Sequence, residues 1–384
     1  MKPIYLDYNA TTPTDPAVIE SMLPFLYENF GNPANILNQY GWTAENAVKE
    51  AAKNVADLIH CQPQELVWNA GATEGNNTVV FALIRKLKQL EPNEKIHFIT
   101  SQAEHWSVIN SFKAAEKFEG IELDLIPVNQ DGIVTVQDLK KYIKPHTKLV
   151  SLMWVNNEIG SINPVKELAE FCQQNKIYFH TDATQALGKI DVDLQKTPVH
   201  FLTFSAHKFY GPKGVGCLFT RAMIQLDPFL FGGGQQRNQR SGTLNVPSIV
   251  GTGTAAKIAK EKMHAEAKRT RELLKKLYTE LKIELPDLKI NGPDLENTDL
   301  RSPVNLSLQF NKQADLVLPE LSKIAFSLGS ACSTAGTSSS HVLKAIGLTD
   351  KQAQSTIRLS IGRWTTESDI RQAAETLIKA FKPC

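Results

Sequence analysis

The chain has 384 residues, with 42 Lys and Arg against 40 Asp and Glu and a formal net charge of +2. Because these charges are balanced and scattered, they give no electrostatic reason to expect binding to nucleic acid or to an anionic membrane. No signal-peptide pattern opens the sequence, and no apolar stretch approaches the ~18 residues of a membrane span. We therefore expect a soluble, cytoplasmic protein, long enough for two or three domains.

The chain contains five cysteines, an odd number without CxxC spacing. This usage argues against a disulfide framework and against a structural zinc site, so we expect no metal. Cys172 and Cys217 lie in apolar patterns typical of a core, and we expect a structural role for Cys61. Cys384 is the last residue, which leaves Cys332 as the cysteine of interest.

Helix-period and strand-period segments alternate between about Thr43 and Thr220. Apolar positions from Ala44 to Leu58 predict an amphipathic helix. Buried strands are predicted from Leu66 onward and by the nearly continuous apolar runs at 95–100, 148–155, 177–182 and 200–204. Such runs, separated by helices, indicate a mostly parallel sheet covered on both faces, with ligands collecting at the carboxyl ends of its strands.

Polar residues follow the first three of these strands. The strand that begins at Leu66 passes through Gly71 into a helix, whose free N–H groups and the Thr73 hydroxyl form a ready site for a phosphate. His105 follows the second strand and can lie flat on a cofactor ring and exchange protons, although an ordinary loop histidine is the alternative. Asn157 follows the third strand and can hydrogen-bond a phenolic oxygen.

The next two strands lead into a carboxylate and a lysine. The run 177–182 ends in Asp182, with Gln185 three residues on, and the run 200–204 leads into Ser205, His207 and Lys208. A desolvated lysine can lose its proton and attack a carbonyl, although a surface lysine is the alternative for Lys208 taken alone. Pyridoxal phosphate (PLP) needs such a pair: the lysine forms a Schiff base, and the aspartate keeps the pyridine nitrogen protonated so that the ring acts as an electron sink.

The rest of the chain reads as a second, smaller unit. A long helix is predicted over 248–281, followed by a Pro- and Asn-rich boundary over 285–303. Short strands are then predicted at 304–310, 325–328 and 356–361. We therefore predict an α/β fold in three parts: an N-terminal segment (1–15) packing with the small domain, a large PLP-binding domain (16–260) and a small α+β domain (261–384) that carries Cys332.

Two residues of this smaller unit are candidates for chemistry. Cys332 precedes a loop rich in Ser, Thr and Gly, which is poor core material but can carry a thiol between two positions. A buried cysteine at a strand end is the alternative. Arg358 lies inside an apolar strand pattern and needs an anionic partner, either a substrate carboxylate or a structural salt bridge.

Longer motifs extend from Tyr5-Leu-Asp-Tyr-Asn-Ala-Thr-Thr-Pro13 to Gly362-Arg-Trp-Thr-Thr-Glu367. Between them lie Gly71-Ala-Thr-Glu74, Glu104-His105, Val155-Asn-Asn-Glu-Ile-Gly160, Asp182-Ala-Thr-Gln185, Ser205-Ala-His-Lys208, Arg240-Ser-Gly-Thr-Leu244 and Gly329-Ser-Ala-Cys332. Over nearly its whole length the chain resembles the cysteine desulfurases of the NifS/IscS type, PLP enzymes of the class V aminotransferase family. It departs from the usual family pattern at Asn38, Ala103, Trp106 and Trp154.

The resemblance implies the PLP-dependent transferase fold of type I and a homodimer with two shared active sites. It implies that Lys208 forms the Schiff base, that Asp182 partners the ring nitrogen and that His105 stacks on the ring. Gln185 and Asn157 would contact the oxygen side of the ring. The phosphate would be held by Ala72, Thr73, Ser205 and His207, and by Thr243 from the other subunit.

The same resemblance implies a reaction. Arg358, with Asn157, would bind the substrate L-cysteine, and the freed Lys208 would remove the α-proton. The Cys332 thiolate would attack the substrate sulfur, giving L-alanine and a Cys332 persulfide, with His105 as a proton donor or acceptor. The persulfide would pass to an acceptor protein that the sequence does not name, since iron–sulfur cluster assembly, tRNA thiolation, cofactor sulfuration and DNA sulfur modification all begin with it.

Two other functions remain open at this point. A selenocysteine lyase or C–S lyase of the same cofactor class would release the chalcogen directly. A catalytically silent PLP-fold protein would act as a scaffold, although the presence of Lys208, Asp182, His105 and Cys332 argues against this.

Overall fold

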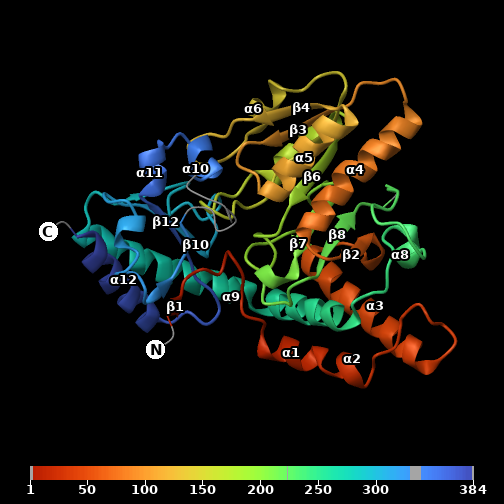
Figure 1. The fold of residues 1–384 in the computed structure, drawn as a ribbon, viewed down its shortest axis with the longest axis horizontal. Helices are drawn as coiled ribbons and strands as arrows, with labels where there is room; N and C mark the ends of the chain where they lie inside the picture. The colour runs from red at the N-terminus through yellow and green to blue at the C-terminus, as the bar shows by residue number, and fades with distance from the viewer. Residues whose placement is uncertain (1–2, 223, 329–338, 383–384) are drawn as a thin grey trace.

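In the computed structural model, which describes residues 3–222, 224–328 and 339–382, the largest sheet has seven strands in the order β2-β8-β7-β6-β5-β3-β4 (Figure 1). Its strands are β2 (Leu66–Asn69), β3 (His97–Ser101), β4 (Glu122–Ile126), β5 (Thr147–Ser151), β6 (Tyr178–Asp182), β7 (Phe201–Ser205) and β8 (Gly216–Thr220). Neighbouring strands from β4 through β7 pair in parallel, and β8 runs antiparallel to both β7 and β2. This mostly parallel sheet confirms the predicted α/β class.

Alternate residues of each central strand pack into two different cores. Phe98 and Leu149 join one apolar cluster with helices α4 and α5, while their neighbours Ile99 and Val150 join another with α3, α7 and α9. The helices of this part of the chain are α1 (Pro16–Met22), α2 (Pro24–Tyr27), α3 (Gln39–Ile59), α4 (Ala72–Leu90), α5 (Trp106–Glu119), α6 (Val136–Lys140), α7 (Val165–Gln174) and α8 (Gln235–Asn238). Because helices cover both faces, the central strands β3, β5, β6 and β7 are buried at nearly every position.

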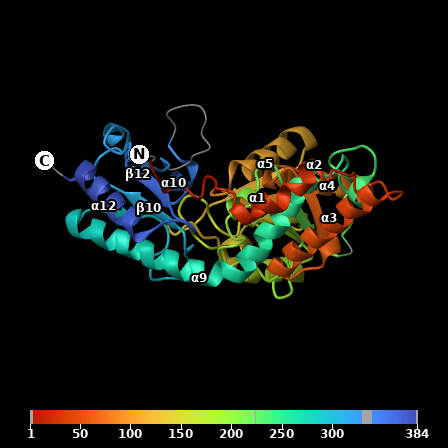
Figure 2. The same ribbon diagram turned by 90° about the horizontal axis from the view of Figure 1, so that it is seen from below.

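The smaller unit has an antiparallel sheet in the order β12-β10-β9 and a separate parallel pair, β1-β11. Its elements are β1 (Ile4–Tyr5), β9 (Lys289–Ile290), β10 (Asn305–Gln309), β11 (Ile324–Ala325), β12 (Thr356–Ser360), α10 (His341–Ala345), α11 (Asp350–Gln354) and α12 (Glu367–Phe381). Helix α9 (Val246–Glu284) runs along both units (Figure 2), packing on α3 at one end and on α12 at the other.

Some observed limits differ from those expected. Strand β5 ends at Ser151 rather than near residue 155. Beyond this end, the N–H of Leu152 still donates to a carbonyl within β6 at 3.1 Å, and the N–H of Trp154 donates to the carbonyl of the last residue of β6 at 3.0 Å. Strand β11 ends at Ala325, where the sequence predicted a strand over 325–328. The predicted domain limit at residue 260 falls inside α9, which serves both units, and the three-part division stays a prediction. Within residues 3–222, 224–328 and 339–382, no helix is long and apolar enough to cross a membrane.

Candidate active site

A cavity of about 310 Å³ lies at the carboxyl ends of the parallel strands. Ten of the twelve residues that the sequence analysis named as site residues line it: Ala72, Thr73, His105, Asn157, Asp182, Gln185, Ser205, His207, Lys208 and Arg358. The fold thus gathers residues separated by up to 286 positions in the chain (358 − 72) around one space.

Six further residues line the cavity that sequence reasoning had not assigned to the site, namely Asn9, Ala10, Ser107, Met153, Val155 and Thr184. Asn9, Ala10, Val155 and Thr184 stand in quoted motifs, which were the signal that could have identified them. Ser107 and Met153 stand in none of these motifs.

Asp182, the last residue of β6, lies at the base of the cavity and is 5 % exposed. Its Oδ1 accepts from the backbone N–H of Thr184 at 2.9 Å, and its Oδ2 accepts from Nδ2 of Asn76 at 3.0 Å. Asn76 belongs to α4 and also donates to Oγ of Ser107. Both carboxylate oxygens are therefore held by N–H donors, which fixes the orientation of the negative charge.

His105 caps the N-terminus of α5. Its Nδ1 accepts from the backbone N–H of Ser107 at 3.1 Å, so a neutral ring carries its proton on Nε2. Burial is the main cause that lowers the pKa of His105; Asp182 opposes this shift, while Lys208 and His341 add to it. The ring is thus a neutral imidazole near pH 7, with one nitrogen already committed to the backbone.

Lys208 ends the short 3₁₀ helix Ala206–Lys208 that follows β7. Its Nζ donates to the carbonyls of Asn9 and Ala10 at 2.8 and 2.6 Å. Nδ1 of the neighbouring His207 lies 3.0 Å from Oγ1 of Thr11. Burial is the main cause that lowers the pKa of His207 to about 4. The N-terminal segment therefore forms one wall of the cavity through both backbone and side-chain contacts.

The turn between β2 and α4 needs a glycine. Gly71 has φ +139°, and a Cβ there would lie 3.1 Å from Oγ of Ser205. That Oγ accepts the N–H of Ala72, the first residue of α4, at 2.8 Å. Strand β7 and the start of α4 are thereby brought together, with the helix N-terminus and Thr73 at the cavity.

Arg358 on β12 has the structural salt bridge that the sequence left open, and it also lines the cavity. Its Nη2 lies 2.9 Å from Oδ1 of Asp7 and donates to Oγ of Ser327 at 2.8 Å, while Nη1 donates to the carbonyl of Asn157 at 3.2 Å. The side chain is 2 % exposed. A fixed cation thus faces the cavity from the smaller unit.

The cysteines fall into two groups, those within the described residues and those outside them. Cys172 and Cys217 are buried, as expected, and Cys61 is half-buried. Burial raises the pKa of Cys61 and Cys172 to about 12 and that of Cys217 well above its usual range, so these thiols are protonated near pH 7. Cys332 and Cys384 lie outside the described residues.

Thr243 is exposed and does not line the cavity. Nearby, Arg240 pairs with Glu74 at the start of α4 through Nε and Oε1 at 2.8 Å, which ties the 240–244 segment to the turn beside the cavity. Of the departures from the family pattern, Asn38 caps α3 by accepting the N–H of Gly41 at 3.0 Å. The ring of Trp106 lies 4.1 Å from that of His341.

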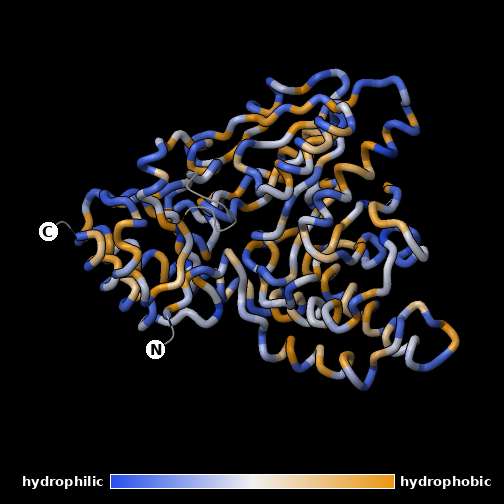
Figure 3. Tube along the Cα trace, viewed as in Figure 1, coloured by the Kyte–Doolittle hydropathy of each residue, from blue (hydrophilic) through white to orange (hydrophobic). Residues whose placement is uncertain are grey.

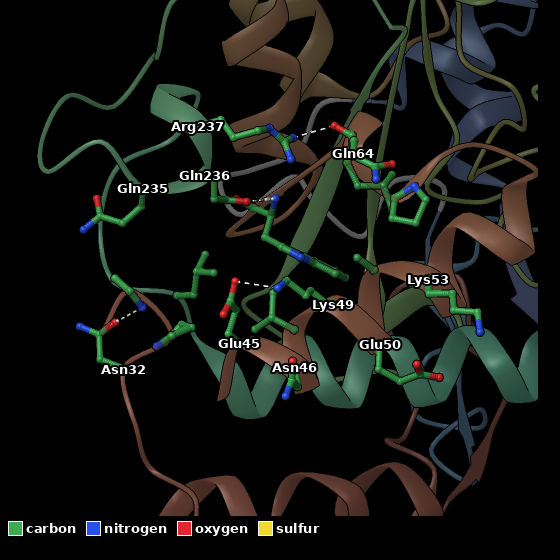
Figure 4. A pocket seen from close by; sticks show the side chains of 18 residues that line it. Asn32, Glu45, Asn46, Lys49, Glu50, Lys53, Gln64, Gln235, Gln236 and Arg237 are labelled. Carbon is green, nitrogen blue, oxygen red and sulfur yellow. Dashed lines mark hydrogen bonds and ion pairs between the residues drawn. The ribbon is translucent and has the colours of Figure 1, made fainter. Parts of the chain in front are cut away.

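A second cavity, of about 820 Å³, lies between α3 and the 235–237 turn (Figure 4). None of the predicted site residues lines it. Several of its polar groups are paired with each other: Nζ of Lys49 lies 2.8 Å from Oε1 of Glu45, and Arg237 donates to the carbonyl of Gln64 at 2.6 Å. Such pairs occupy these groups with one another.

The residues around the smaller cavity fit PLP. Three buried polar atoms of its lining have no hydrogen-bond partner among the residues that the structure describes: Oδ1 of Asn9, Oγ1 of Thr184 and Nε of Arg358. Unpaired buried polar atoms are costly and call for a ligand or water. The donor set also suits PLP, with a carboxylate, an amine and a helix N-terminus around one space.

Comparisons with known proteins agree with this site. The family described as aminotransferase class-V matches residues 4–372. Cysteine desulfurase IscS of Methylobacillus flagellatus is 43% identical over 371 residues, which cover 96% of this chain and 89% of that protein. A solved NifS-like protein is 33% identical with a TM-score of 0.89 and covers 98% of each chain. The structure of SspA in complex with cysteine is 32% identical with a TM-score of 0.80, covering 94% of this chain and 99% of that one.

The chain therefore belongs to the class V aminotransferase family, whose members depend on PLP. Within this family it is one of the NifS/IscS-like cysteine desulfurases.

Proposed function

We propose that this enzyme binds PLP in the cavity at the strand ends and converts L-cysteine to L-alanine, leaving the sulfur as a persulfide on Cys332. The observation that carries the proposal is the gathering of Lys208, Asp182 and His105 around one cavity in a member of this family. PLP, when bound, supplies an electron sink for the carbanion of the amino acid.

Lys208 attaches the cofactor and then moves the proton at Cα of the substrate. Asp182 keeps the ring nitrogen protonated, and the N–H donors on its two oxygens hold the carboxyl group in a fixed orientation for this task. His105 stacks on the ring and donates or accepts a proton through Nε2, because Nδ1 already accepts from Ser107. The three side chains all line the cavity, and each can perform its role from there.

The phosphate and oxygen sides of the cofactor have separate residues. Gln185 and Asn157 contact the ring oxygen. The phosphate is held by Ala72, Thr73, Ser205 and His207, and by Thr243 of the second subunit. The N-terminus of α4 supports this assignment, since its N–H groups and dipole favour an anion.

The substrate and the thiol act last. Arg358 and Asn157 bind the carboxylate of L-cysteine. The Cys332 thiolate attacks the substrate sulfur, so an S–S bond forms while the Cβ–S bond breaks. The electron pair of the broken bond remains on the carbon fragment, which leaves as L-alanine after protonation. The raised pKa values of Cys61, Cys172 and Cys217 support a different cysteine as the nucleophile.

The enzyme acts as a homodimer in this proposal. Nine large apolar side chains between residues 19 and 42 are exposed, on the segment that projects at the lower right of Figure 3: Ile19, Leu23, Leu26, Tyr27, Phe30, Ile36, Leu37, Tyr40 and Trp42. An apolar surface of this extent favours a partner, and a second copy also supplies Thr243. The persulfide then passes to an acceptor protein, and the enzyme works in the cytoplasm.

Alanine formation from L-cysteine tests the proposal. Wild-type protein loaded with PLP should form alanine and carry a persulfide on Cys332, whereas Cys332→Ala should bind PLP and form almost no alanine. Undiminished turnover by Cys332→Ala would instead indicate a C–S lyase, and a large preference for L-selenocysteine would indicate a selenocysteine lyase. Lys208→Ala should lose the visible absorbance of attached PLP; a wild-type protein without that absorbance would contradict the cofactor assignment.

A further inference from the structure

Lys189 is a buried lysine that the proposed reaction does not use. It follows Gln185 by four residues and is 9 % exposed. Its Nζ donates to Oε1 of Gln185, and no carboxylate pairs with it among the residues that the structure describes. Burial is the main cause that lowers the pKa of Lys189 well below its usual range, and the charges of Lys208 and Arg358 add to the shift.

The surroundings of Lys189 explain why it has no carboxylate partner. It lines a narrow space of about 20 Å³ together with Tyr8, Tyr210, Glu266 and Arg363. The one carboxylate there, Glu266, is already paired with Nε of Arg363 at 2.6 Å. Keeping a lysine at such a place costs free energy, so its hydrogen bond to Gln185 is the contact to explain.

The hydrogen bond from Lys189 fixes the orientation of the Gln185 amide. The oxygen and nitrogen ends of an amide have the same shape, and only their partners distinguish them. Because Oε1 accepts from Lys189, Nε2 points the other way and donates to the carbonyl of Asn9 at 2.9 Å. The same carbonyl accepts from Nζ of Lys208 at 2.8 Å. An unbroken chain of hydrogen bonds thus connects Lys189 with the lysine of the cavity.

We propose that Lys189 is a positioning residue that locks the Gln185 amide, so that Gln185 presents only N–H donors to the cavity and to the Asn9 carbonyl. This inference rests on the proposed function, in which Gln185 contacts the phenolic oxygen of PLP. A locked N–H donor favours the ionised form of that oxygen. An unlocked amide could turn its Oε1 toward the same oxygen and would repel it.

The expected consequence is a change in the pH dependence of the visible absorbance of bound PLP. Lys189→Met removes the donor to Oε1 and nearly preserves the volume of the side chain. We expect its absorbance midpoint to lie about one pH unit above that of the wild type, because a hydrogen bond to the ionised oxygen is weakened. The measurement is an absorbance titration of the PLP-loaded protein and needs no turnover.

Two matched variants separate this mechanism from a general effect of charge. Lys189→Gln keeps an N–H donor for Oε1 and should retain a midpoint close to that of the wild type. Lys213→Met removes an exposed lysine whose charge reaches His207 but which makes no contact with Gln185, and it should leave the midpoint unchanged. Equal shifts in Lys189→Met and Lys189→Gln, or a shift in neither, would overturn the proposal.

A second measurement tests the route through Gln185. Gln185→Leu should raise the midpoint by at least as much as Lys189→Met, and adding Lys189→Met to Gln185→Leu should change it no further. An unchanged midpoint in Gln185→Leu would overturn the proposal even if Lys189→Met did not fold. Wild-type protein that binds no PLP would contradict the proposed function itself, whereas wild-type absorbance with an unshifted Lys189→Met contradicts only the lock.

Discussion

The cavity beside α3 and the cavity at the strand ends differ in size and in chemistry. The larger, about 820 Å³, lies beside α3, and its Lys49 and Glu45 are paired at its partly exposed surface. The smaller, about 310 Å³, gathers a carboxylate, an amine and a neutral imidazole from separate strand ends. A functional site is therefore marked by reactive groups that converge, among them an imidazole whose pKa is lowered by burial, more than by volume.

The largest expected effect comes from the base of the smaller cavity. Asp182→Ala removes the carboxylate that we propose keeps the ring nitrogen protonated, and we expect kcat for alanine formation to fall about a thousandfold. The exposed Asp191 is a matched control, and Asp191→Ala should retain full activity. Steady-state kinetics with saturating PLP make the measurement; activity within about tenfold of wild type in Asp182→Ala would show that the carboxylate does not serve the ring nitrogen.

Sequence reasoning found the strand-end residues because each follows an apolar run that is easy to recognise. Asn9 and Ala10 stand in a quoted motif, but their contacts with Lys208 span 199 and 198 residues, and no local pattern connects them with that lysine. For the same reason sequence reasoning left Arg358 open between two partners, since Asp7 lies 351 residues away. Local periodicity predicts strands and their ends. A cavity wall formed by a distant segment can be recognised only in the folded chain.

The role of Lys189 was also beyond the sequence. A lysine after a glycine reads as a surface residue, and only the fold buries it against Gln185. The cofactor and the fold class could be predicted because several strand ends agreed with each other. The orientation of one amide could not, because it depends on which atom a neighbouring side chain reaches.

The exposed apolar segment near the larger cavity provides the second prediction. Leu37 is 86 % exposed, and Leu37→Asp places a charge where we propose that the second subunit packs. We expect a monomer by light scattering and activity at least about tenfold lower, since in a monomer Thr243 could not reach the second site as we propose. Phe118→Asp is the control, because Phe118 is 71 % exposed on α5, away from that segment. A dimeric Leu37→Asp protein would place the interface elsewhere.

Two glutamates sharpen the contrast between buried and exposed groups. Burial raises the pKa of Glu104 to about 8, whereas hydrogen bonds from Lys144 and His146 lower the pKa of Glu122 to about 2. The folded state holds the proton of Glu104 more tightly than the unfolded state does. Its contribution to stability is therefore complete below pH 4.5 and is lost as the pH rises through 8.

The Tm of the wild type should fall between pH 6 and pH 9. The Tm of Glu104→Gln, whose side chain at this position cannot ionise, should fall by about 3 °C less over the same range. Glu122→Gln should follow the wild type over this range, because the pKa of Glu122 lies below it. Calorimetry at the two pH values makes the comparison. The same fall in Tm for Glu104→Gln and wild type would mean that Glu104 is already ionised at pH 6.

The smallest effect is expected at the larger cavity. Lys49 and Glu45 form an exposed pair on neighbouring turns of α3, with side chains 67% and 39% exposed. Glu45→Gln should change the free energy of unfolding by less than about 0.5 kcal/mol, because water screens such pairs. Alanine formation should be unchanged, since none of the predicted site residues lines this cavity. A clear loss of activity in this variant would show that the larger cavity also takes part in the reaction. Cavity volume would then indicate the functional site better than the chemistry of the lining residues does.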